Sequence, residues 1–92
     1  MNIAELIALA KVRSGKTQKE MAEDMGYANA AQVSKIATGV KAADASEILY
    51  FAQAANMPPI EVLAELESQR HPALAEVWKT TLQRAKSNIT SL

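Results

Sequence analysis

Apolar residues recur along most of the chain at the three- and four-residue steps of an α-helix, and glycines, prolines and capping residues cut this pattern into short segments. In the first segment the apolar positions are Ile3, Leu6, Ile7 and Ala10, and Ser14-Gly15 marks its end. Helices are predicted in this way over residues 2–14, 18–25, 30–38, from 43 or 44 to about 55, about 60–70 and about 73–87. The pattern therefore predicts an all-α protein.

The second and third segments have the clearest boundaries. Thr17 stands three residues before Glu20, which is the spacing of a capping box at a helix N-terminus. Gly26 follows the apolar positions of the second segment, and glycine adopts the left-handed conformation after a helix without steric cost. We expect Asn29 to cap the third helix and Gly39 to end it.

Two short helices joined at Gly26 predict a helix-turn-helix pair. Ala22 is small enough for these helices to cross closely, and Val33 and Ile36 are predicted to attach the third helix to the core. The outward face of the third helix is then small and polar. It comprises Ala30, Ala31, Gln32, Lys35 and Thr38.

Composition supports one small helical domain and excludes several chemistries. Hydrophobic residues make up 49% of the 92 positions, with only one Phe, one Trp and two Tyr, so helix formers dominate over strand formers. Without cysteine the chain has no disulfide, thiolate zinc site or cysteine nucleophile. We also found no Gly-rich phosphate loop and no Ser/His/Asp arrangement, and the single histidine, His71, has no partner ligands. The sequence therefore predicts neither an enzyme nor a bound metal or cofactor.

Charge is balanced overall but uneven along the chain. Residues 1–41 carry six basic and four acidic side chains, residues 42–70 carry one and five, and residues 71–92 carry three and one. An anionic ligand is therefore expected to meet the first segment. The apolar stretch Ile3 to Ala10 is interrupted by Glu5 and is far shorter than the roughly 20 residues of a membrane span, so a cytoplasmic protein without a membrane partner is expected.

The helix-turn-helix residues resemble those of a known family. Thr17 to Ala22 with Gly26, Val33 to Ile36 with Thr38-Gly39, and Ala52 to Met57 stand in the order found in the Cro and phage-repressor (XRE-like) regulators. This resemblance implies a five-helix, lambda-repressor-like domain over residues 1–70 with a C-terminal helical extension over 71–92. It implies a bacterial or phage repressor that binds double-stranded DNA as a homodimer through the major groove.

The resemblance also implies which side chains contact DNA. Asn and Gln pair with adenine, Lys donates to guanine and Ala contacts a thymine methyl in the major groove, so the outward face of the third helix has suitable chemistry. Lys11, Arg13 and Lys16 are further candidates for phosphate contacts. The implied DNA-binding residues are Thr17, Gln18, Lys19, Asn29, Ala30, Ala31, Gln32, Ser34, Lys35, Thr38 and Lys41.

The turn departs from the family pattern in its length. Six residues separate Gly26 from Val33, one more than is common in the family, which implies a longer turn or a later start of the third helix. Ala37 stands where the family usually has Glu, so an intradomain polar contact is expected to differ. For Tyr27, in this turn, packing beside the core is favoured over a phosphate contact through its hydroxyl.

The C-terminal segment predicts an amphipathic helix. Its apolar positions recur at three- and four-residue steps, and they are Leu74, Val77, Trp78, Thr81, Leu82, Ala85 and Ile89. Two interpretations fit equally: this face packs on the first and fifth helices, or it forms a dimer contact through Leu74, Val77, Trp78 and Leu82. The alternative function is a protein-interaction module of the same fold, such as an antitoxin or antirepressor, that binds a protein through residues 42–92.

Overall fold

The computed structural model describes residues 1–90, with side chains described for residues 1–86. Within this part the chain forms six α-helices and one 3-10 helix, and no strand. The helices are α1 (Ile3–Ser14), α2 (Gln18–Asp24), α3 (Ala31–Ala37), α4 (Ala45–Ala54), α5 (Pro59–Arg70), η1 (Pro72–Leu74) and α6 (Ala75–Thr90). The predicted all-α class is confirmed, and each predicted helix is found within three residues of its expected bounds.

Local capping explains most of the helix starts. Thr17 and Asp44 each head a complete capping box, with Glu20 and Glu47 as the third residues of α2 and α4. The prediction for Asn29 is wrong by one position, because Ala30 occupies the cap of α3 and makes no side-chain cap. Asn29 lies one residue earlier, and its Oδ1 accepts the Ala31 N–H at 2.9 Å. The side chain thus still pairs one free N–H of the first turn.

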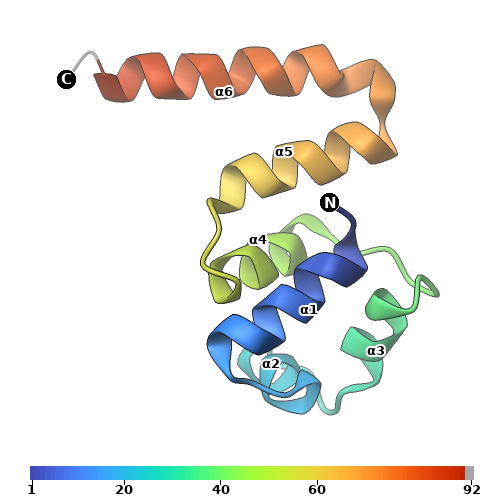
Figure 1. Ribbon diagram of the computed structural model, residues 1–92. Helices are drawn as coiled ribbons and strands as arrows, with labels where there is room; N and C mark the ends of the chain where they lie inside the picture. Colours follow the sequence, from blue (N-terminus) through green and yellow to red (C-terminus); the bar gives the residue numbers. More distant parts are fainter. Residues whose placement is uncertain (91–92) are drawn as a thin grey trace.

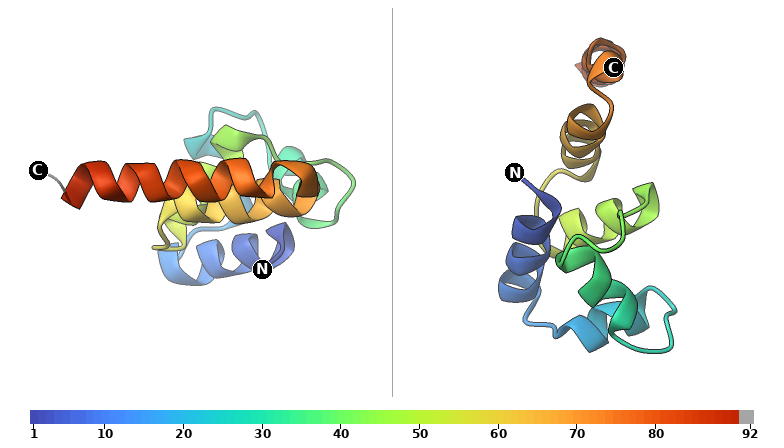
Figure 2. Two further views of the ribbon diagram at one scale, coloured as in Figure 1. Left: turned by 90° about the horizontal axis from the view of Figure 1, so that it is seen from above. Right: turned by 90° about the vertical axis from the view of Figure 1, so that its right-hand side faces the viewer.

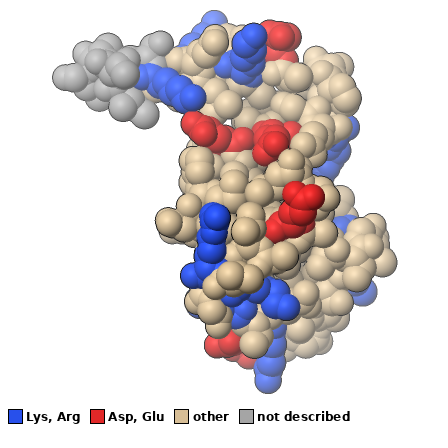
Figure 3. Space-filling view, in the orientation of Figure 1, with Lys and Arg blue, Asp and Glu red and all other residues tan. Residues whose placement is uncertain are grey.

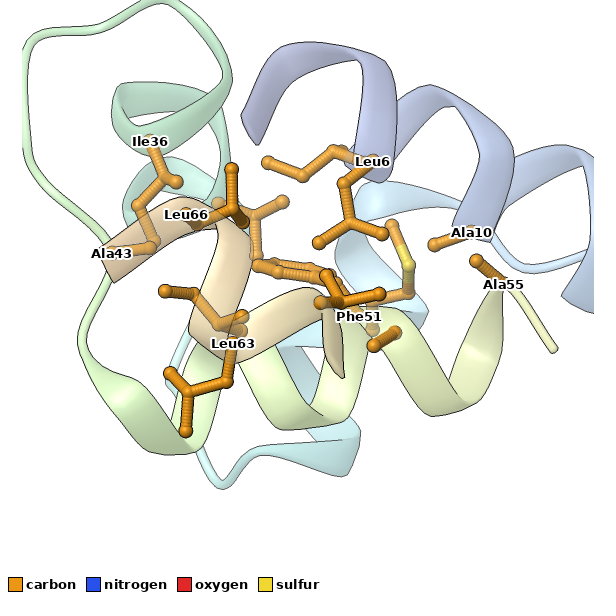
Figure 4. Packing of buried hydrophobic residues seen from close by; sticks show 14 of the residues in the cluster. Leu6, Ala10, Ile36, Ala43, Phe51, Ala55, Leu63 and Leu66 are labelled. Atoms are coloured by element: carbon orange, nitrogen blue, oxygen red, sulfur yellow. The ribbon is translucent and has the colours of Figure 1, made fainter. Parts of the chain in front are cut away.

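The core is built from one face of each of the helices α1 to α5. Phe51 is fully buried, and its ring meets that of Tyr50 edge to face at a centroid distance of 5.6 Å. Figure 4 shows Leu6 and Ala10 from α1, Ile36 from α3, and Leu63 and Leu66 from α5 gathered around Phe51. Ala22, Val33 and Ile36 are buried as the sequence predicts, so α2 and α3 are both attached to this core.

The six helices form a compact body with a helical hairpin at one end. Helices α1 to α4 make the body, α5 crosses one end of it, and α6 runs back over α5 (Figures 1 and 2). Helix α6 packs against α5, and α5 separates it from α1. The C-terminal helix thus lies on the fifth helix, as in the first of the two interpretations, but it does not cover the first helix.

The arrangement places α2 and α3 at the opposite end of the molecule from α6 (Figure 1). Between them the turn leaves Gly26 at a φ of +82°, in the left-handed region that favours glycine. No helix of the described residues is long and apolar enough to span a bilayer.

Candidate nucleic-acid interface

The α2–α3 pair is held from its inner side. The Ala22 carbonyl accepts the N–H of Tyr27 at 2.9 Å, and the Glu23 carbonyl accepts that of Gly26 at 2.9 Å, which closes the end of α2. Ala22, Val33 and Ile36 have no exposed surface. Helix α3 therefore buries Val33 and Ile36 in the core, and its remaining face points outward.

This outward face has the small, polar character expected from the sequence. Ala31, Ser34, Lys35 and Thr38 are exposed, while Ala30 and Gln32 are half-buried. The turn and α3 together line a shallow hollow, formed by Gly26 to Asn29, Ala31, Gln32 and Lys35. The structure thus brings Asn29, Gln32 and Lys35 to one concave surface.

The remaining predicted residues of α3 and α2 are also on the surface. Thr38 donates its hydroxyl proton to the Ser34 carbonyl at 3.0 Å, so only the lone pairs of its oxygen stay available to a ligand. Thr17 uses its hydroxyl oxygen to accept the Glu20 N–H at 3.1 Å. Gln18 is half-buried and Lys19 is exposed at the start of α2.

The structure divides the basic residues of the first segment into two groups. Arg13 donates to the Ala55 carbonyl at 2.8 Å, Lys16 is paired with Asp24, and Lys41 lies 3.5 Å from Glu47. In contrast, Lys11, Lys19 and Lys35 make no ion pair with other described residues and are exposed. These three are the lysines best able to meet an anion.

Glu47 is a buried carboxylate that the sequence analysis did not single out. Its side chain is 1% exposed. Oε1 accepts the Asp44 N–H at 2.9 Å and lies near Lys41, and Oε2 accepts the Tyr27 hydroxyl at 2.7 Å. Burial alone would raise the pKa of Glu47, but the Asp44 N–H, Tyr27 and Lys41 together hold this pKa below its usual value. The same spacing that marks Thr17 and Glu20 relates Asp44 to Glu47, and that was the available signal.

Tyr27 packs in the turn as the sequence favours. Its ring is half-buried against the core, and its hydroxyl donates to Glu47. That hydrogen bond, with burial and the charge of Glu47, raises the pKa of Tyr27 to about 12. The only hydroxyl proton of Tyr27 is thus engaged inside the protein.

Asp24, at the end of α2, has a similar pair of partners. Its Oδ2 accepts the Tyr50 hydroxyl at 2.6 Å and pairs with Lys16. The hydrogen bonds from Lys16 and Tyr50 lower the pKa of Asp24, and burial with the bond to Asp24 raises the pKa of Tyr50. Asp24 and Glu47 therefore both link α4 to the α2–α3 pair.

We expect the free energy of unfolding to fall as the solution is acidified, and Glu47 to contribute part of that fall. The folded pKa of Glu47 lies below its ordinary value of 4.5, so the unfolded chain takes up the proton first. Its stabilisation is present above 4.5 and is lost as the pH decreases through the folded pKa. Urea unfolding followed by circular dichroism between about pH 6 and pH 3 measures this loss.

In this experiment Glu47→Gln is expected to show a shallower decrease than the wild type. Glu23→Gln is the control, because Glu23 is an exposed carboxylate on the neighbouring helix and makes no ion pair with another described residue. Identical pH profiles for the wild type and Glu47→Gln would show that Glu47 does not contribute in this way.

The packing of α6 on α5 divides the four predicted dimer residues into two half-buried and two exposed residues. Trp78 and Leu82 are half-buried and line the groove against α5, while Leu74 and Val77 are 49% and 60% exposed. Lys86 pairs with Glu61 of α5 at 3.3 Å. The side chain of Ile89 lies outside the described residues. Leu74 and Val77 are therefore the most exposed residues of the predicted set.

The surface charges are distributed as the segment counts of the sequence predict, with acidic residues concentrated in residues 42–70. On the face drawn in Figure 3, acidic side chains lie at the level of α5, just below α6, and Lys and Arg are frequent over the body below them.

Within the described residues no group of three or more His, Cys, Asp or Glu is placed to hold a metal ion. Comparison of the chain with protein-family models, curated proteins and solved structures found no match.

Proposed function

We propose that this protein is a sequence-specific DNA-binding regulator with a lambda-repressor-like fold, in which α3 is the recognition helix and the partner is double-stranded DNA. The observation that carries the proposal is the exposed polar face of α3, whose apolar side chains Val33 and Ile36 are fully buried behind it. This face is at the end of the molecule farthest from α6, where no other helix covers it (Figure 1).

In this proposal the side chains that line the hollow beside α3 contact base edges, and the lysines without an ion pair bind phosphates. Asn29 and Gln32 have the amide groups that pair with adenine, and Lys35 is suited to guanine. Lys11, Lys19 and Lys35 would neutralise about three phosphates per protomer, which corresponds to a slope near −3 in a plot of log K against log salt. So few charges give weak binding for one protomer, and a dimer on two half-sites supplies the rest.

The position of α6 constrains such a dimer. Because α6 and α3 lie at opposite ends, pairing through the outer face of α6 would point the two α3 helices in opposite directions (Figures 1 and 2). Two α3 helices can enter successive major grooves of one duplex only if the subunits stand side by side. We therefore propose that DNA binding orders a side-by-side pair.

Selection from a random-sequence duplex library tests the function and yields the operator at once. We expect the wild type to enrich a near-palindromic site, and Gln32→Ala combined with Lys35→Ala to abolish this enrichment. Sedimentation of the protein with the enriched duplex should give two protomers per site. Failure of the wild type to enrich any sequence, with weak retention even at low salt, would refute the proposal.

The exposed Leu74 of η1 and Val77 of α6 favour a second candidate function, which is binding of a protein partner where η1 leads into α6. Such a partner would lie far from α3 and would leave the DNA face free. Replacing Val77 by Asp should then abolish the partner complex without changing retention on DNA. If the protein binds DNA alone, no partner complex should form with the wild type either.

A further inference from the structure

Two hydrogen bonds join the α2–α3 pair to α4 in opposite directions. Tyr27 in the turn donates its hydroxyl to Glu47 of α4 at 2.7 Å, and Tyr50 of α4 donates its hydroxyl to Asp24 of α2 at 2.6 Å. Glu47 and Tyr50 are three residues apart on α4, so they lie on one helix face, and Asp24 and Tyr27 are also three residues apart. Each side therefore contributes one hydroxyl and one carboxylate.

Each carboxylate is also paired with a lysine from a loop next to the pair. Lys16 follows α1 and is paired with Asp24, and Lys41 follows α3 and lies 3.5 Å from Glu47. A hydroxyl that donates to an ionised carboxylate makes a short and strong hydrogen bond. The carboxylates are kept ionised by their lysines, so both bonds stay charge-assisted.

Helix α3 has few other directional contacts. It spans Ala31–Ala37, has no side-chain cap at its first position, and is attached to the core by Val33 and Ile36. Apolar contacts are non-directional, so they fix how deeply α3 is buried better than they fix the direction of its axis. The two tyrosine hydrogen bonds are the directional contacts between α4 and the segment that leads into α3.

We propose that this reciprocal pair of hydrogen bonds sets the orientation of α3, which makes Tyr27 and Tyr50 positioning residues for DNA binding, together with Glu47 and Asp24. The inference rests on the proposed function. The hydroxyl of Tyr27 holds the turn and contacts no phosphate, because its proton is given to Glu47. A recognition helix fixed in advance loses less conformational freedom on binding.

Tyr27→Phe and Tyr50→Phe test this inference, because each removes one hydroxyl and keeps the ring. In each variant we expect backbone amides of α3 to exchange with deuterium about tenfold faster, with α5 amides unchanged. We expect affinity for duplex DNA to fall about tenfold, with the salt slope kept, since no phosphate contact is removed. A phosphate contact by the Tyr27 hydroxyl would instead reduce the size of the slope.

Leu63→Ala is the matched control, because it truncates a buried core side chain that belongs to α5, outside α2 and α3, and is expected to lower global stability. Equal losses of α3 protection and affinity in Leu63→Ala would overturn the inference, and so would wild-type exchange and affinity in both tyrosine variants. If the wild type binds no duplex, the proposed function fails. The exchange data alone then decide: faster exchange confined to α3 supports the positioning role, and unchanged exchange overturns it.

Discussion

Replacing Lys35 by Glu is expected to weaken binding of duplex DNA about 100-fold, which is about 2.7 kcal/mol of binding free energy. Lys35 is exposed on the outward face of α3 and lines the hollow beside the turn. The substitution removes a donor to a base or phosphate and places a negative charge where the duplex is also negative. Because the side chain is exposed, the free energy of unfolding should change by no more than about 1 kcal/mol.

Arg84→Glu is the matched control for Lys35→Glu, since it makes the same change in net charge on α6, at the other end of the molecule. Fluorescence anisotropy with a labelled duplex, at two salt concentrations, compares both variants with the wild type. Arg84→Glu should bind nearly as the wild type does. Equal weakening by the two variants would mean that net charge, not the α3 face, controls DNA binding.

Truncating Phe51 to Ala is expected to lower the free energy of unfolding by about 3–5 kcal/mol. Phe51 has no exposed surface and belongs to one core cluster with side chains from α1, α3 and α5, so the removed ring leaves a cavity. Its ring also supports Tyr50 through the edge-to-face contact. A loss of this size is a large fraction of the about 5–15 kcal/mol that stabilises a typical domain.

Urea unfolding followed by circular dichroism measures the effect of Phe51→Ala. Phe51→Leu is the control, because it keeps most of the buried apolar volume and should cost clearly less than Phe51→Ala. A loss below about 1 kcal/mol for Phe51→Ala would mean that the helices do not share one core around this ring.

The helices were predictable because their signals are local. Apolar spacing, the Thr17–Glu20 capping box and the glycines at 15, 26 and 39 act within a few residues of the backbone that they shape. The outward face of α3 followed from the same periodicity once Val33 and Ile36 were assigned to the core. The one-residue error at Asn29 arose because its side chain caps from outside the helix instead of at the cap position.

The pairing of charges was not predictable, because it depends on residues that the fold brings together. Glu47 is buried near the start of α4, where Tyr27, twenty residues earlier, and Lys41 meet it. The sequence likewise gives no means of separating Lys16, which pairs with Asp24, from Lys19, which is exposed. For Trp78 and Leu82, the apolar pattern indicated that they would be covered, but it left open whether α5 or a second subunit would cover them.

Amide chemical shifts of the 15N-labelled chain, recorded while a duplex of about 20 base pairs is added at low salt, test the central claim most directly, because non-specific binding in the about 10⁻⁴ to 10⁻⁶ M range is measurable in this way. The proposed function predicts shifts concentrated at residues 17–19 and 29–35, with α5 and α6 unaffected. Absence of shifts in α2 and α3, or shifts confined to α5 and α6, would contradict the assignment of α3 as the recognition helix.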